Sequence, residues 1–117
     1  MVIADTLLCP LDAIPEGGTT AVENVAALDG DSVIVQREGA ALRAWLNVCP
    51  HAGRRLDYAP GQFLRKNELI ICAVHGASFD CGSGLCVGGP CRGESLRALP
   101  VEVRGGEVWL LGQGNAA

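Results

Sequence analysis

Two short segments, Cys49-Pro50-His51 and Cys72-Ala73-Val74-His75, dominate the sequence. Each segment contains one cysteine and one histidine, and together they hold both histidines of the chain. Residues 52–71, between the two segments, are enough for a strand to leave the first segment and return to the second. Because thiolate sulfur and imidazole nitrogen suit the same metals, we interpret four residues as a metal-binding set. They are Cys49, His51, Cys72 and His75.

The mixing of the two ligand types distinguishes between two metal centres. Two cysteines and two histidines can hold zinc tetrahedrally, but zinc modules usually pair cysteine with cysteine and histidine with histidine. In a Rieske-type [2Fe–2S] cluster, two histidines replace two cysteines on one of the irons. Halves that each contain both ligand types therefore favour one [2Fe–2S] cluster. A structural zinc-binding interaction module and unligated core residues are the alternatives.

The two segments and their surroundings resemble the Rieske [2Fe–2S] domain family, and within it the soluble Rieske-type ferredoxins. The resemblance extends from about Asn47 to Leu111. It implies that Cys49 and Cys72 bind one iron and that His51 and His75 bind the other. The implied fold is an all-β antiparallel sandwich with a small cluster-binding subdomain, about residues 47–93, in a single domain spanning residues 1–117. The matching residues are Cys49–Gly53, Leu56, Gly61, Cys72–Gly76, Phe79, Asp80, Gly89 and Pro90.

Departures from the respiratory branch of the family affect the expected reduction potential. Arg54 and Val74 stand where that branch has two disulfide-bonded cysteines, and Ala77 and Phe79 stand where it has hydroxyl groups that hydrogen-bond the cluster sulfurs. Fewer hydrogen bonds to sulfur destabilise the reduced, more negative form. The resemblance therefore implies a potential near the low end of the Rieske range, roughly −150 mV.

The rest of the chain predicts β structure with many turns, since it has 16 glycines, 6 prolines and short apolar runs. We expect one hairpin from Ser32–Arg37 and Leu42–Asn47, and a strand over Glu68–Cys72. The clearest hairpin joins Val101–Arg104 to Glu107–Leu110 through Gly105-Gly106, which pairs Arg104 with Glu107 and Val103 with Val108. The Gly-rich stretch 81–93 is expected to be a loop.

Composition and charge restrict the function. The net charge of −4 and the lack of a basic stripe argue against nucleic acid as a partner. No apolar run approaches the length of a membrane helix, and residues 1–5 make a poor signal peptide, so we expect no membrane association and a cytoplasmic location. Four further cysteines are expected to be free thiols, with a disulfide or a second metal site among the last three as alternatives. They are Cys9, Cys81, Cys86 and Cys91.

The resulting functional prediction is a one-electron carrier that is not itself an enzyme. By resemblance, its partners are a flavin-dependent ferredoxin reductase and a terminal oxygenase. The alternative is an electron-entry subunit or fragment of a Rieske non-haem iron oxygenase, which needs a second iron on a 2-His-1-carboxylate triad. Both histidines are already assigned to the cluster. Four basic residues between the ligand segments either dock an acidic partner or form an ordinary solvated rim; they are Arg54, Arg55, Arg65 and Lys66.

Overall fold

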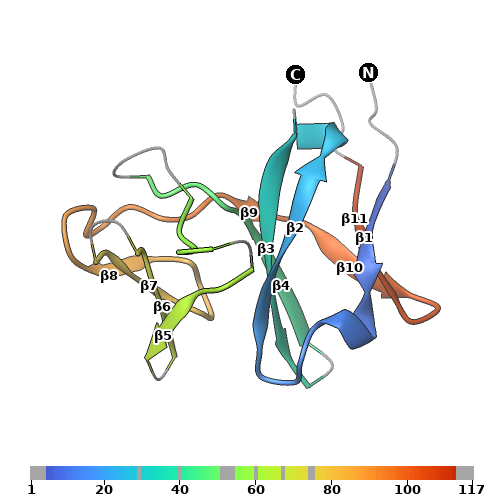
Figure 1. Ribbon diagram of the computed structural model, residues 1–117, viewed down its shortest axis with the longest axis horizontal. Helices are drawn as coiled ribbons and strands as arrows, with labels where there is room; N and C mark the ends of the chain where they lie inside the picture. Colours follow the sequence, from blue (N-terminus) through green and yellow to red (C-terminus); the bar gives the residue numbers. More distant parts are fainter. Residues whose placement is uncertain are drawn as a thin grey trace.

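The computed structural model describes residues 5–28, 30–39, 41–50, 55–59, 61–66, 68–73 and 76–112. These residues form three antiparallel β-sheets, shown in Figure 1. The helical elements among them are two single 3-10 turns, Leu11–Ala13 and Ala26–Leu28. The expected all-β antiparallel fold is therefore confirmed. No helix in the described part of the chain is long and apolar enough to cross a membrane.

Two of the sheets form the sandwich. The first has the strand order β1-β11-β10, and the second has the order β2-β3-β4-β9. Apolar residues from both sheets share one core, which includes Val33, Val35, Val108 and Leu110. The strands of these sheets are β1 (Thr6–Pro10), β2 (Thr19–Val25), β3 (Asp31–Glu38), β4 (Ala41–Leu46), β9 (Ala98–Leu99), β10 (Val101–Arg104) and β11 (Glu107–Leu110).

The third sheet is inserted between β4 and β9 and lies to one side of the sandwich in Figure 1. Its strand order is β5-β6-β7-β8, with β5 at Leu64–Lys66, β6 at Leu69–Ile71, β7 at Ser78–Asp80 and β8 at Cys86–Gly88. A second apolar cluster lies beneath it and contains Phe79, Ile70 and five of the six cysteines.

Strands β3 and β4 belong to both cores. Val33 and Val35 point into the sandwich core, whereas Ile34, between them, belongs to the second cluster. On β4, Ala44 belongs to the sandwich core and Trp45 to the second cluster. Because successive side chains of a strand face opposite sides, one sheet can support both layers, and five consecutive residues of β3 are buried. The part of the chain that contains Cys49 and Cys72 therefore packs on a sheet whose opposite face is buried in the sandwich core.

The terminal hairpin forms as expected. Val103 pairs with Val108 and Arg104 with Glu107, and Gly105 and Gly106 have φ values of +55° and +80°. The expected pairing of the strands around 32–37 and 42–47 is also confirmed, as β3 with β4. The prediction that 81–93 is entirely loop is wrong, because β8 lies within it and pairs with β7.

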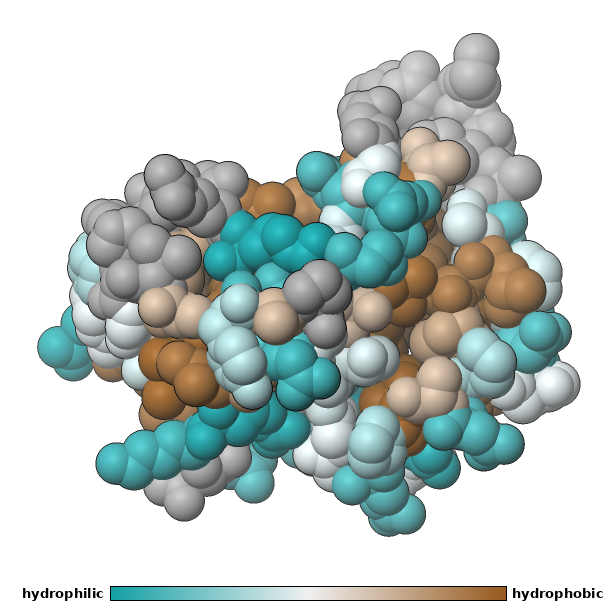
Figure 2. Space-filling view, viewed as in Figure 1, coloured by the Kyte–Doolittle hydropathy of each residue, from teal (hydrophilic) through white to brown (hydrophobic). Residues whose placement is uncertain are grey.

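Exposed apolar side chains are scattered over different elements. They include Leu7 on β1, Leu64 on β5, Val87 on β8 and Val103 on β10. The face drawn in Figure 2 accordingly shows hydrophobic patches separated by hydrophilic residues. Scattered exposed apolar groups are ordinary on a folded surface and indicate no particular partner.

Candidate metal centre

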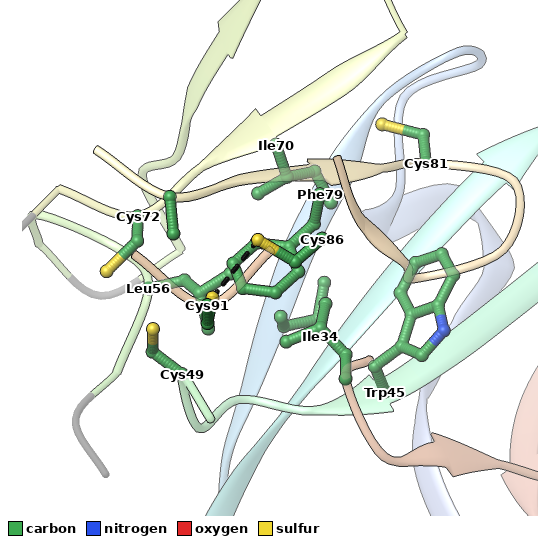
Figure 3. Packing of buried hydrophobic residues seen from close by; sticks show 12 residues of the cluster. Ile34, Trp45, Cys49, Leu56, Ile70, Cys72, Phe79, Cys81, Cys86 and Cys91 are labelled. Atoms are coloured by element: carbon green, nitrogen blue, oxygen red, sulfur yellow. Dashed lines mark hydrogen bonds between the residues drawn. The ribbon is translucent and has the colours of Figure 1, made fainter. Parts of the chain in front are cut away.

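Two of the four expected ligands lie in the described part of the chain. Cys49 is the third residue after β4, and Cys72 follows β6 directly. Their exposed fractions are 0% and 1%. In Figure 3 the sulfur atoms of both residues lie on the same side of the buried cluster. Two thiols from separate loops are thus brought to one region, as a shared metal centre requires.

Backbone hydrogen bonds join the two sides of the connection between β6 and β7, in which Cys72 lies. The Cys72 N–H donates to the Ala77 carbonyl at 2.8 Å, and the Gly76 N–H donates to the Cys72 carbonyl at 2.9 Å. The strands on either side, β6 and β7, are paired. A residue that follows a paired strand directly has its position fixed by that ladder, so Cys72 has little freedom to move.

Hydrogen bonds join the second ligand segment to Leu56 and Asn47, which lie on either side of the first ligand segment in the sequence. The Ala73 N–H, next to Cys72, donates to the Leu56 carbonyl at 3.0 Å. The Leu56 N–H in turn donates to Oδ1 of Asn47 at 2.9 Å, and Nδ2 of Asn47 donates to Oγ of Ser32 on β3. Asn47 is 1% exposed. A buried amide therefore links both loops to the sandwich.

Arg55 makes a second link to the sandwich. Its guanidinium donates to both carboxylate oxygens of Asp57, at 2.9 and 2.6 Å, and to both oxygens of Glu23 on β2. The two carboxylates raise the pKa of Arg55 further above its usual range. Burial by itself raises the pKa of Asp57, but hydrogen bonds from Arg55, the Gly61 N–H and Asn47 outweigh burial, and the pKa lies below its ordinary value.

Two of the four basic residues between the ligand segments make contacts within the protein. Arg55 binds Glu23 and Asp57, and Arg65 donates to the Gly17 carbonyl and the Thr19 hydroxyl. Arg65 therefore holds the inserted sheet, and Arg55 the chain that leads into it, against the sandwich. Lys66 is exposed at the end of β5, and Arg54 lies outside the described residues.

The other two expected ligands, His51 and His75, lie outside the described residues. The structure therefore describes the cysteine half of the site. That half fits a [2Fe–2S] cluster, because it offers two buried thiols from two hydrogen-bonded parts of the chain. In the part of the chain that is described, no three histidine, cysteine or acidic side chains are arranged to hold a metal ion. Cysteines alone thus do not form a metal site there, and the histidines stay the predicted second half.

The remaining cysteines are free thiols, as expected, but two of them are closer to the site than the sequence indicated. None of the six cysteines forms a disulfide. Cys86 and Cys91 lie in the cluster that contains Cys49, with their Sγ atoms 3.1 Å apart (Figure 3). Burial, the hydrogen bond to Cys86 and the nearby Cys49 raise the pKa of the Cys91 thiol to about 12. The spacing of these cysteines along the chain gave no sign of this proximity.

The Gly-rich segment between them packs on the second ligand loop. Gly89 has φ +91°, and a Cβ added there would lie 2.8 Å from the Cα of Ala77. A residue with a side chain does not fit this approach without moving backbone. Glycine at position 89 therefore allows residues 88–90 to cover the loop that begins at Cys72.

A β-sandwich with a small inserted sheet, carrying buried cysteines in two coupled loops, defines a class of small metal-binding electron-transfer domain. The Rieske [2Fe-2S] domain family matches residues 5–103, and the chain belongs to this family. One [2Fe–2S] cluster is accordingly its cofactor, which removes zinc as the assigned metal.

Two solved structures are similar over nearly the whole chain. The ferredoxin of carbazole 1,9a-dioxygenase from Nocardioides aromaticivorans IC177 is 33% identical, with a TM-score of 0.70 over 92% of this chain and 97% of the ferredoxin. The terminal oxygenase of carbazole 1,9a-dioxygenase from Novosphingobium sp. KA1 is 19% identical, with a TM-score of 0.77 over 96% of this chain and 30% of the oxygenase. The second similarity concerns the fold alone.

A curated relative, the oxidoreductase NdmD of Pseudomonas putida, is 31% identical over 97 residues. The alignment covers 75% of this chain but spans only 16% of the length of NdmD. The same kind of domain therefore occurs both as a small protein and as part of a much longer one.

Proposed function

We propose that this protein is a one-electron carrier that accepts electrons from a reductase and delivers them to an oxygenase. The observation that carries the proposal is the match to a ferredoxin over 92% of this chain and 97% of the ferredoxin, at 33% identity. A ferredoxin of the same size and fold supports the role of an electron carrier for this chain. On this proposal the chain transforms no substrate itself, forms a single domain over residues 1–117 and acts in the cytoplasm.

The cluster would be held by Cys49 and Cys72 on one iron and by His51 and His75 on the other. When bound, it supplies a centre that takes up and releases one electron. Leu56, Ile70 and Phe79, all 0% exposed, surround the cysteine side and exclude water from it. The bonds from Ala73 to Leu56 and from Leu56 to Asn47 keep the two loops in register. The protein around the cluster then needs to move little when the cluster takes up or releases an electron.

The oxygenase partner is supported by a family relative. A ferredoxin that is 24% identical, with a TM-score of 0.71, has been solved in a complex of reduced oxygenase and oxidised ferredoxin. We extend this pairing to the present chain, with a flavin-dependent ferredoxin reductase as the electron donor. The formal charge of −4 does not suit nucleic acid, which is not proposed as a partner.

A second candidate is the electron-entry domain or a fragment of a larger oxidoreductase or Rieske oxygenase. It is favoured by the similarity to 16% of NdmD and to 30% of a terminal oxygenase. Such a domain would receive electrons from, or pass them to, another part of the same chain. The carrier instead requires transfer between separate proteins.

The deciding experiment is metal and sulfide analysis of purified protein, followed by one-electron titration with EPR detection. If the protein is an electron carrier, it should contain two irons and two acid-labile sulfides per chain and be reduced by one electron. It should also support catalytic turnover with separately added reductase and oxygenase. Replacement of His51 or His75 by alanine should abolish the cluster, whereas Cys81→Ala should retain it. Colourless protein with one zinc per chain would contradict the proposal. Turnover that is seen only when this chain is fused to a further domain would favour the second candidate.

A further inference from the structure

Two buried thiols that the proposed electron transfer does not use lie in direct contact with each other. Cys86 begins β8, and Cys91 is the third residue after that strand ends. Their exposed fractions are 1% and 2%. The Cys91 thiol donates to the sulfur of Cys86, and the two Sγ atoms are 3.1 Å apart (Figure 3). The sulfur atoms of a disulfide are about 2.05 Å apart, so these two need to approach by only about 1 Å to bond.

Backbone hydrogen bonds hold both cysteines to the same short stretch of chain. The Cys86 N–H donates to the Glu94 carbonyl at 2.7 Å, and the Gly93 N–H donates to the Cys86 carbonyl at 3.1 Å. The Glu94 N–H donates to the Cys91 carbonyl at 2.9 Å. Because both residues are fastened to Gly93 and Glu94, each thiol is held beside the other. Two reacting groups held in this way behave as if each were present at a high local concentration.

No other cysteine competes for the pair once the cluster is bound. The two cysteines that ligate iron are committed to it as thiolates. Cys81 lies apart from both members of the pair in Figure 3, and Cys9 packs against the sandwich core. If either Cys86 or Cys91 is oxidised, the cysteine within reach of its sulfur is therefore the other member of the pair.

We propose that Cys86 and Cys91 form a disulfide under oxidising conditions, and that this disulfide holds residues 88–90 over the loop that begins at Cys72. The inference goes beyond electron transfer, because the bond forms between two side chains that are not ligands and leaves the oxidation state of the cluster unchanged.

The oxidant is a small-molecule disulfide such as glutathione disulfide. The thiolate of one cysteine attacks it, a protein–glutathione disulfide forms, and a glutathione thiolate leaves. The second cysteine then attacks the protein sulfur of that mixed disulfide, which closes the bond between Cys86 and Cys91 and releases the second glutathione. Two electrons and two protons pass from the pair to glutathione. Excess reduced thiol reverses both steps.

The ring that this bond closes contains the segment that covers the second ligand loop. A Cβ added to Gly89 would lie 2.8 Å from the Cα of Ala77, so the two backbones are in close contact. The Ala77 carbonyl in turn accepts the hydrogen bond from the Cys72 N–H, at 2.8 Å. A disulfide fixes both ends of residues 88–90 and restricts the open conformations that they can reach. The cluster beneath them should then be lost more slowly.

The depth of the pair determines how fast the bond forms. Buried thiols react slowly with external reagents. Val87, Pro90 and Arg92, which flank the two cysteines in the sequence, are exposed, so the pair lies directly beneath the surface. Without a catalyst we therefore expect oxidation over minutes to hours, and a pair that stays reduced wherever reduced thiols are in excess.

The test is incubation of the holoprotein with excess glutathione disulfide, followed by alkylation and mass analysis. Wild-type protein should lose two hydrogen atoms and take up two fewer alkyl groups than before, with Cys86 and Cys91 the residues left unalkylated. Cys91→Ser and Cys86→Ser should each form no disulfide. Cys81→Ser is the matched control, since Cys81 is 0% exposed in the same buried cluster and lies apart from the pair, and it should form the bond as wild type does.

A second readout is the rate at which a chelator removes iron. Wild-type protein that carries the disulfide should lose iron about tenfold more slowly than the reduced protein. Dithiothreitol should restore the faster rate. Cys91→Ser should lose iron at one rate whether or not it has been treated with the oxidant. If Cys91→Ser does not retain the cluster, Cys86→Ser serves for the same comparison.

Three results would overturn the inference. The first is wild-type holoprotein that keeps both thiols through the incubation. The second is a disulfide that joins a different pair of cysteines. The third is equal iron loss from the disulfide and dithiol forms, which would show that the bond does not hold the covering segment. Wild-type protein purified without iron and sulfide is a different result, and it contradicts the proposed function instead.

Discussion

Arg55, six residues after Cys49, binds Glu23 on β2 through two parallel hydrogen bonds, Nη1 to Oε1 at 2.5 Å and Nη2 to Oε2 at 2.7 Å. The same guanidinium holds the carboxylate of Asp57, whose side chain is 1% exposed. The chain that follows the first ligand segment is thus attached to the sandwich at Arg55 by a planar group that contacts two carboxylates. Arginine suits this position because its fork of donors matches carboxylates in fixed geometry.

Replacement of Arg55 by alanine should therefore destabilise the fold. The substitution leaves the buried Asp57 carboxylate without its cation, which costs about 2–3 kcal/mol of unfolding free energy. Glu23→Gln keeps the Arg55–Asp57 contact and removes only a charge that is 37% exposed, so its cost should be below about 1 kcal/mol. Urea unfolding of both variants measures the difference. Lys66→Ala, at an exposed position on β5, is the control and should be neutral.

The acid stability of the protein should depend on Asp57. Its pKa is lower in the folded protein than in the unfolded chain, because the bonds from Arg55, Gly61 and Asn47 outweigh burial. The folded state then binds fewer protons, and the stabilisation is complete above about pH 3.9 and lost as the pH falls through the folded pKa. Asp57→Asn should unfold at lower urea at neutral pH and show a flatter decline below pH 4. Asp12→Asn, which removes an exposed carboxylate, should decline as wild type does.

Local sequence signals predicted the parts of the fold that depend on neighbouring residues. Gly105-Gly106 supplies the positive φ values of a two-residue turn, and the turn then sets the pairing of Arg104 with Glu107. The position of Cys72 at the end of a strand follows in the same way from the apolar run before it. Wherever a turn or a strand end determines the geometry, the sequence was sufficient.

Long-range contacts had no such signal. Strand β8 contains a glycine and forms because its backbone pairs with β7, not because its side chains alternate. Arg55 and Glu23 are 32 residues apart, and nothing near either residue indicates the other. The proximity of Cys91 to Cys49 likewise depends on how three loops pack together. The contacts of the arginines and the proximity of the cysteines therefore could not be predicted from the sequence and are seen only in the structure.

Asn47 should be needed for the order of both ligand loops. Its Oδ1 is the acceptor for the buried Leu56 N–H. Asn47→Ala leaves that N–H without its acceptor, with an expected loss of about 2 kcal/mol in unfolding free energy. Faster loss of the cluster on incubation with an iron chelator should accompany it, since Leu56 also holds Ala73. Ser32→Ala removes the acceptor of Nδ2 and the hydrogen bond that the Ser32 hydroxyl donates to Glu23, but it leaves the Leu56 N–H paired, so it should have the smaller effect on both measurements. Equal chelation rates for Asn47→Ala and wild type would contradict this role.

Gly89 and Gly93 provide a matched pair for the covering segment. Both have positive φ, +91° and +95°, so an alanine at either position costs roughly 1–2 kcal/mol in backbone strain. At Gly93 the new Cβ would meet nothing within 4 Å, whereas at Gly89 it would lie 2.8 Å from the Cα of Ala77. Gly93→Ala should accordingly lower the melting temperature while keeping the full iron and sulfide content. Gly89→Ala must displace the backbone beside the second ligand loop, and it should lose cluster as well as stability. Equal cluster content in the two variants would show that residues 88–90 do not support the Cys72 loop.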